Sequence, residues 1–258
     1  MSLTPRTDLA KTILRRLQSL ASRLRKSSGT AATLKHHRQP FQSYLEGTGI
    51  EIGALHNPMP VDRRRATVRY VDRLPLEEQR RQYPELADHP LVAPDIIADA
   101  DRLTPLADES QDFVIANHLL EHLPDAIGAM KEWYRVLRPG GILFLALPDK
   151  RVTFDKHRPR TTLAHLVADH RDRGEGSRSS HYEEYARLVH NMEGDDAVRE
   201  AARLMETSYS IHFHVWIPED IERLIAHVQD VFHLRWNVVQ YVDSTGSDEF
   251  ICVLRKAG

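Results

Sequence analysis

The chain has 258 residues, of which 41% are hydrophobic, and its formal net charge is −2 at pH 7. This length is sufficient to bury the core of one α/β domain of ordinary size. The single cysteine, Cys252, excludes an intrachain disulfide, and the sequence has neither a membrane-spanning apolar stretch nor a secretory signal, so we expect a cytoplasmic protein.

Residues 1–40 form a basic arm that contains nine Lys or Arg residues and one acidic residue. Its apolar residues recur at helical spacing, at Leu9, Ile13, Leu17, Leu20 and Leu24. A basic amphipathic helix of this kind packs on its own domain or a partner subunit, which we favour, or lies on an anionic membrane surface. We expect no nucleic-acid binding, because the remaining chain is acidic and contains no recognition module. The main domain is therefore predicted over residues 41–258.

The first two strands of this domain each carry an acidic residue, Glu51 within the first and Asp72 at the end of the second. Residues 49–54 read GIEIGA, where Gly53 allows the backbone to approach a ligand closely. Pro58 and Pro60 disfavour a regular helix before the next strand, which is predicted at 67–72. Asp72 ends that strand, where a carboxylate can accept hydrogen bonds from ribose hydroxyls; the alternative is a solvated turn residue.

Residues 97–148 predict a strand, a helix and a second strand. The runs 113–116 and 142–147 are continuously apolar, which suits strands that are buried on both faces of a parallel sheet. Between them, Pro124 and Asp125 are suited to the first turn of a helix, and residues 139–141, Pro-Gly-Gly, end it. Such a unit has a right-handed crossover.

The same segment resembles a known family. The residues that carry the likeness are Asp99-Ala100, Leu103, Asp112-Phe113, the run NHLLEHL at 117–123 and the run LRPGG at 137–141. In these residues the chain is similar to class I S-adenosylmethionine-dependent methyltransferases with a type 11-like methyltransferase domain. The resemblance implies a Rossmann-like α/β fold, with a seven-stranded, mostly parallel sheet and helices on both faces. It also implies S-adenosyl-L-methionine as the cofactor.

The resemblance further implies a set of cofactor-binding residues. Glu51 stands at the family's acidic position, Asp99 would meet the adenine amino group, and Asp101 would lie at the same pocket or else cap a surface helix. The turn after Gly53 departs from the family pattern, because Ala54 follows where further glycines are usual. The complete set implied is Glu51, Gly53, Ala54, Asp72, Arg73, Asp99, Ala100, Asp101, Asn117 and His118.

About sixty residues, 149–210, are inserted after the fifth strand, before a helix that starts at 216–220. The insertion leaves the carboxyl end of a central strand, where α/β sheets place ligands, so we expect it to form a lid over an acceptor pocket. Its arginines suit an anionic acceptor, or else they pair with acidic residues of the lid itself. The arginines near the predicted mouth of the pocket are Arg151, Arg158, Arg160 and Arg178. Strands at 234–241 and 250–254 are predicted to close the sheet with an antiparallel edge.

The predicted reaction is O-methylation of a polar small molecule or a saccharide. A histidine has a suitable pKa to remove the acceptor's proton, and the candidates are His181 and His214. His212 and His214 would face the same way on a strand, but no set of residues has zinc-like spacing, so no metal site is predicted. The alternatives are a regulatory protein that binds the cofactor without methyl transfer, and a nucleotide-binding enzyme with other chemistry.

Overall fold

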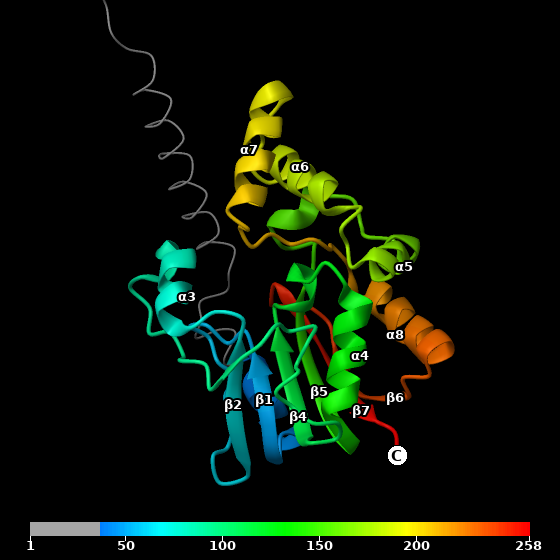
Figure 1. Ribbon diagram of the computed structural model, residues 1–258. Helices are drawn as coiled ribbons and strands as arrows, with labels where there is room; N and C mark the ends of the chain where they lie inside the picture. The colour runs from blue at the N-terminus through cyan, green and yellow to red at the C-terminus, as the bar shows by residue number, and fades with distance from the viewer. Residues whose placement is uncertain (1–36) are drawn as a thin grey trace, which may run out of the picture.

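The computed structural model describes residues 37–258, which form one seven-stranded sheet with the strand order β3-β2-β1-β4-β5-β7-β6 (Figure 1). The predicted basic helix at the N-terminus lies outside these residues. The strands are β1 (Gly47–Ile52), β2 (Ala66–Asp72), β3 (Ile96–Ile97), β4 (Gln111–Asn117), β5 (Leu137–Pro148), β6 (Trp236–Val242) and β7 (Glu249–Lys256). The chain order reverses between β1 and β4, and open α/β sheets bind ligands beside such a reversal.

Six of the seven strands run in one direction, which confirms the mostly parallel sheet. The antiparallel strand is β7, which pairs with β5 on one side and with β6 on the other. The antiparallel strand, which we predicted at the edge, therefore lies one strand inside it, and β6 is the edge strand. Since β7 carries a fully buried apolar run from Phe250 to Leu254, it suits this interior position.

One face of the sheet is covered by α4 (Ala126–Val136) and α8 (Pro218–Phe232). Both helices begin where the sequence predicted. The side chain of Asp125 caps α4 by accepting a hydrogen bond from the backbone N–H of Gly128 at 2.7 Å, and that of Asp220 accepts from Ile217 at 3.0 Å. Trp133 of α4 is fully buried in this layer.

The opposite face is covered by the 3-10 helix η1 (Gln39–Tyr44) and by the segment that joins β1 to β2. Phe41, Leu45 and Met59 pack there against Phe113 and Phe144 of the central strands. No helix forms between β1 and β2, as the two prolines predicted. Helical segments thus cover both faces. Within residues 37–258, α-helices cover one face and the 3-10 helix η1 covers the other. A short helix α3 (Leu76–Gln82) and a 3-10 turn η2 (Pro84–Leu86) follow β2.

The insertion after β5 folds into a helical layer of its own. It contains η4 (Phe154–His157), α5 (Leu163–Asp172), α6 (Arg178–Leu188) and α7 (Gly194–Glu206). Tyr182, Tyr185 and Leu204 belong to a separate apolar cluster inside this layer. In Figure 1 the helices α6 and α7 lie beyond the carboxyl ends of the parallel strands, which is where a lid was expected.

The chain returns from the insertion to the sheet along residues 211–216. The backbone N–H groups of Phe213 and His214 both donate to the carbonyl oxygen of Glu121, at 2.7 and 3.1 Å. Glu121 belongs to the 3-10 turn η3 (Leu120–His122) that follows β4, so the insertion is fixed directly to the end of a central strand. No helix within residues 37–258 is long and apolar enough to span a membrane.

Candidate functional site

The sheet register brings three predicted site residues into one row. Ile52 pairs with Val71 of β2 and with Ala116 of β4, so the residues that follow, Gly53, Asp72 and Asn117, lie level at the carboxyl edge. The N–H of Gly53 donates to the carbonyl oxygen of Val71 at 2.9 Å, which continues the ladder by one residue. These residues flank β1, at the point where the strand order reverses.

Glu51 and Asn117 present buried acceptors at this edge. Glu51 is only 1% exposed, and its Oε1 accepts from the backbone N–H of Met59 at 2.8 Å and from Asn117 Nδ2 at 3.5 Å. Glu51 Oε2 and Asn117 Oδ1 are buried and have no hydrogen-bond partner. Burial raises the pKa of the Glu51 carboxyl to about 7, against the weaker effect of the Met59 hydrogen bond. Such atoms are costly unless a ligand pairs with them.

The turn after β1 has a backbone that requires glycine at one position. Gly53 has φ 69°, in the left-handed region, and a Cβ there would meet the Leu119 side chain at 3.4 Å. Leu55, two residues later, also has a positive φ, of 45°. Ala54 lies between them and is half-buried. Gly53 is thus the position in this turn where a left-handed backbone directly follows the last residue of β1.

The residues predicted for the ribose and adenine occupy different environments. Asp72 is half-buried, its Oδ1 accepts from the N–H of Leu74 at 2.9 Å, and burial raises its pKa. Asp99 and Arg73 are exposed. The carbonyl oxygen of Ala100 accepts from Trp133 Nε1 at 2.9 Å, which ties this loop to α4.

Asp101 is engaged elsewhere. Its Oδ2 accepts a hydrogen bond from Arg173 Nη2 at 3.0 Å, and Arg173 follows α5 in the insertion. Asp101 also lines a surface hollow together with Lys131 and His170, beside α4. The Asp101 carboxylate is therefore committed to a neighbouring arginine, a contact that belongs to neither of the two roles considered for it.

His118 occupies a strained position at the exit of β4. Its φ is 47°, which costs a non-glycine residue on the order of 1–3 kcal/mol and is typical of functional sites. Its Nε2 lies 2.8 Å from Glu249 Oε2, and its Nδ1 lies 3.8 Å from Glu121 Oε1. Burial alone would lower the pKa of the imidazole, but the Glu249 hydrogen bond and the Glu121 charge outweigh it and raise the pKa.

Glu249 is a functional candidate that the sequence did not reveal. It starts β7, is fully buried, and binds Arg38 through Nε at 3.0 and 3.2 Å and His37 Nδ1 at 3.1 Å, in addition to His118. Although burial opposes ionisation, the three basic partners hold its pKa far below the usual range. An acidic residue directly before an apolar strand was the available signal, but its partners come from distant segments.

The two histidines predicted as the base lie together in a buried cluster. His181 is 8% exposed and His214 is 1% exposed, and both lie beside His165 and Asp169 of α5. Burial lowers the pKa of His181 to about 4 and that of His214 to about 3, helped by the neighbouring histidines. A base so weak and so enclosed is poorly suited to deprotonate an acceptor, so the structure does not favour this assignment.

A second buried group surrounds Glu121, whose two carboxylate oxygens have no hydrogen-bond partner. His122 and His212 bring ligand-type nitrogen atoms within 4.8 Å of it and of each other. His122 Nδ1 lies 2.8 Å from the carbonyl oxygen of Ile211, and His212 Nδ1 lies 2.6 Å from Asp155 Oδ2. The first contact joins the segment before α8 to η3 at the end of β4, and the second joins it to η4 of the insertion.

Most of the inserted arginines are paired within the protein. Arg151 binds Asp149, Arg158 binds Asp155 and Glu184, and Arg160 binds Asp220. The fourth, Arg178, lies over the ring of Tyr182 at 5.8 Å. Arg151 and Arg158 thus pair with acidic residues of the insertion itself, whereas Arg160 pairs with Asp220 of α8, and the case for an anionic acceptor is correspondingly weaker.

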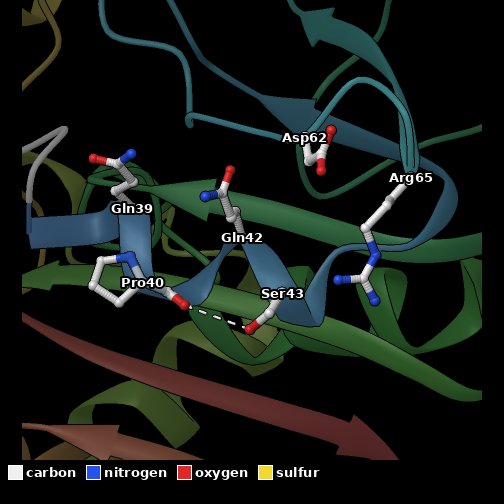
Figure 2. Close-up of a pocket in the computed structure, with 6 residues that line it drawn as sticks. All are labelled: Gln39, Pro40, Gln42, Ser43, Asp62 and Arg65. Atoms are coloured by element: carbon white, nitrogen blue, oxygen red, sulfur yellow. Dashed lines mark hydrogen bonds between the residues drawn. The ribbon is translucent and has the colours of Figure 1, made fainter.

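A polar surface hollow formed by η1 and the segment before β2 lies away from this edge. Its lining residues are Gln39, Pro40, Gln42, Ser43, Asp62 and Arg65 (Figure 2). Arg65 directly precedes β2, so the hollow is near the amino ends of the first two strands. It is thus separated by the length of the sheet from the carboxyl ends, where the candidate site lies.

Comparison with known proteins finds a family match that runs from β1 into β5. Residues 47–145 match the model of a family described as a methyltransferase domain. Over 54 residues the chain is 43% identical to a protein of Mycolicibacterium smegmatis named as a probable S-adenosylmethionine-dependent methyltransferase. That match covers 21% of this chain and spans only 21% of the relative's length.

Two solved structures are similar to this chain over most of its length. A protein of Pyrococcus horikoshii is 15% identical with a TM-score of 0.49, and the likeness covers 89% of this chain and 92% of that one. A structure from Methanosarcina mazei, described as a SAM-dependent methyltransferase, is 18% identical with a TM-score of 0.43, covering 84% of this chain and 97% of that one. Similarities of this size carry no inference about substrate.

Proposed function

We propose that the chain is a class I S-adenosylmethionine-dependent methyltransferase and that it transfers a methyl group from S-adenosyl-L-methionine to a hydroxyl of a polar small molecule or saccharide. The observation that carries the proposal is the row of Gly53, Asp72 and Asn117 at the carboxyl ends of β1, β2 and β4, with Glu51 directly behind it. This is the edge at which open α/β sheets bind nucleotides.

The chemistry of the side chains fits the cofactor. Asp72 offers carboxylate oxygens at the end of β2, the position from which a ribose diol is bound in dinucleotide folds. Glu51 Oε2 and Asn117 Oδ1 are buried acceptors without partners, which suits the methionine ammonium group of S-adenosylmethionine. The missing glycines after Gly53 are then less important, because the ammonium is bound by side chains.

S-adenosylmethionine supplies a methyl group that is already activated on a sulfonium, so the protein needs no nucleophile of its own. Its residues must hold the acceptor in line with the methyl group and remove one proton. In the transfer the methyl carbon leaves sulfur and bonds to the acceptor oxygen, while the hydroxyl proton goes to a base.

We assign the base to His118 in place of His181 or His214. The Glu249 carboxylate accepts the Nε2 proton of His118, which leaves Nδ1 with the lone pair that takes the acceptor's proton. The side chain of His118 is 30% exposed, so an acceptor can reach it, and its raised pKa makes it a stronger base than the buried histidines.

A methyl-transfer assay tests the proposal. The full chain is incubated with S-adenosylmethionine labelled in the methyl group and a panel of hydroxylated metabolites and saccharides, with amine-only and thiol-only compounds as the comparison. We expect label in hydroxyl-bearing compounds and formation of S-adenosylhomocysteine. Label only in amines or thiols would refute O-methylation, and binding without any transfer across the panel would favour the regulatory alternative.

A further inference from the structure

Four side chains with metal-binding groups meet where the insertion joins the sheet domain. His165 and Asp169 lie four residues apart on one face of α5, His181 comes from α6, and His214 comes from the segment before α8. One ligand-type atom from each lies within 4.8 Å of all the others. This cluster is separate from the predicted cofactor residues.

The distances inside the cluster are those of a coordination shell. His165 Nε2 lies 3.0 Å from His181 Nε2 and 3.1 Å from Asp169 Oδ2. Asp169 Oδ2 lies 3.8 Å from His181 Nε2. The His214 ring is close as well, since its Nε2 lies 3.9 Å from Asp169 Oδ2. Tetrahedral ligands that are each about 2.0–2.1 Å from a zinc ion are about 3.3–3.4 Å apart, in the middle of this range.

Hydrogen bonds alone do not satisfy the cluster. Asp169 Oδ2 is buried and has no hydrogen-bond partner, although a histidine nitrogen is only 3.1 Å away. The distance is short enough for a hydrogen bond, so the direction of the N–H is what prevents one. A buried carboxylate oxygen left in this state is costly unless a cation compensates it. His214 Nδ1 is also buried without a partner.

The surrounding groups hold the side chains in place. The Ser177 hydroxyl donates to Asp169 Oδ1 at 2.6 Å, which orients the carboxylate and leaves Oδ2 facing the histidines. His214 Nε2 lies 3.1 Å from the carbonyl oxygen of Pro124, to which it can only donate, so the unpartnered Nδ1 is the nitrogen left to bind a metal ion. Outer contacts of this kind orient the ligands of metal sites.

We propose that His165, Asp169, His181 and His214 bind one Zn²⁺ ion. Three imidazoles and one carboxylate suit zinc, whereas Mg²⁺ and Ca²⁺ prefer shells made of oxygen. Four protein ligands complete the tetrahedron, so the site is structural. It joins α5 and α6 to the segment before α8. Because His214 also contacts Pro124, just before α4, the site attaches the insertion to the domain.

The spacing of the sequence does not reveal this cluster, so the proposal departs from the expectation of no metal site. The ligands are spread over fifty residues and come from three segments, so no short motif records them. The one local signal is His165 followed four residues later by Asp169, a spacing that places both side chains on the same face of a helix.

The test uses the full chain without a histidine tag, purified in zinc-supplemented medium and analysed for metal by mass spectrometry. We expect one zinc per chain, and an apo form, made with a chelator, whose Tm rises by roughly 5–10 °C at 100-fold excess of free Zn²⁺ over its Kd. Replacement by Co²⁺ should give the visible absorption bands of a tetrahedral ion.

Variants locate the ion. His165→Ala, the most exposed ligand at 35%, and Asp169→Asn should each weaken zinc binding by more than about 100-fold, while His157→Ala, an exposed histidine of the same insertion, should leave it unchanged. Two results would overturn the proposal: a wild-type chain that neither retains zinc nor gains stability from it, or zinc binding that persists in His165→Ala and is lost in His122→Ala. Binding of S-adenosylmethionine is measured separately, so failure of the metal site and of the methyltransferase proposal are distinguishable.

Discussion

The buried carboxyl of Glu51, near the end of β1, is the group whose protonation should respond to cofactor binding. Glu51 has a pKa of about 7 because it is buried, and only one of its carboxylate oxygens has partners. In the unliganded protein the raised pKa favours the protonated acid. An ammonium group beside it would favour the carboxylate, so ligand binding and ionisation of Glu51 are linked.

The affinity for S-adenosylmethionine should therefore rise with pH. Between pH 6 and pH 7 we expect a gain of roughly fivefold, which levels off above the pKa of about 7, because binding no longer has to release the proton of Glu51. Calorimetric titration across this range checks it. Glu51→Gln should remove the slope, and adenosine, which lacks the ammonium group, should show none. An equal slope for adenosine would contradict the assignment.

The two aspartates predicted for the nucleoside should behave differently. Asp72→Asn removes the charged acceptor at the end of β2, and a charge-assisted hydrogen bond of about 1.5–3 kcal/mol corresponds to a Kd roughly 10–100-fold higher. Asp101→Asn is the matched control, since its carboxylate is paired with Arg173. Equal losses of affinity in the two variants would show that Asp72 has no special part in binding.

The base assignment is tested at His118. Asparagine tolerates a positive φ, so His118→Asn keeps the backbone and removes the imidazole. We expect kcat to fall by about 10²–10⁴-fold with little change in the Kd for cofactor. In the wild type the rate should rise with pH through a pKa above the ordinary 6.5, because the base acts when neutral. His157→Asn is the control, and full turnover in His118→Asn would exclude the base role.

At the scale of elements, a buried ion pair joins the start of the described chain to β7. Arg38 is almost fully buried and contacts Glu249. Because the pKa of Glu249 is lowered in the folded protein, the contribution of its carboxylate to stability is present above about pH 4.5 and is lost as the pH falls. The sequence assigned residues 1–40 to an arm, yet this arginine packs inside the domain. Charge and spacing could not indicate it, because the partner is 211 residues away.

Removal of one partner from this pair should be costly. Arg38→Ala leaves a buried carboxylate with fewer basic partners, and we expect the free energy of unfolding to fall by about 3–5 kcal/mol in urea denaturation at pH 7. Arg65→Ala breaks the pair with Glu46, whose side chains are about half exposed, and should cost less than about 1 kcal/mol. Similar losses in both variants would contradict a special role for the buried pair.

The elements themselves could be predicted well where the sequence pattern is local. The apolar runs located β4 and β5, Asp125 located the start of α4, and the prolines excluded a helix after β1. The site was predicted as far as the strand ends, since the carboxyl ends of parallel strands share one edge. The groupings around Glu249, Glu121 and Asp169 were not predicted, because each forms only when segments far apart in sequence are packed together.

At the scale of the whole molecule, the fold separates two tasks. The carboxyl ends of β1, β2 and β4 present the cofactor-type acceptors, and the inserted helices beyond them are fixed to η3 through the backbone of residues 213 and 214. The inserted arginines are mostly neutralised, so the insertion contributes shape and polarity more than net positive charge.

The most direct test of this account is a calorimetric titration of the full chain with S-adenosylhomocysteine, the product that remains after methyl transfer. We predict binding of one mole per chain, in competition with S-adenosylmethionine. The contradicting result is no measurable binding of either compound at concentrations up to about 1 mM, which corresponds to a binding free energy weaker than about −4 kcal/mol.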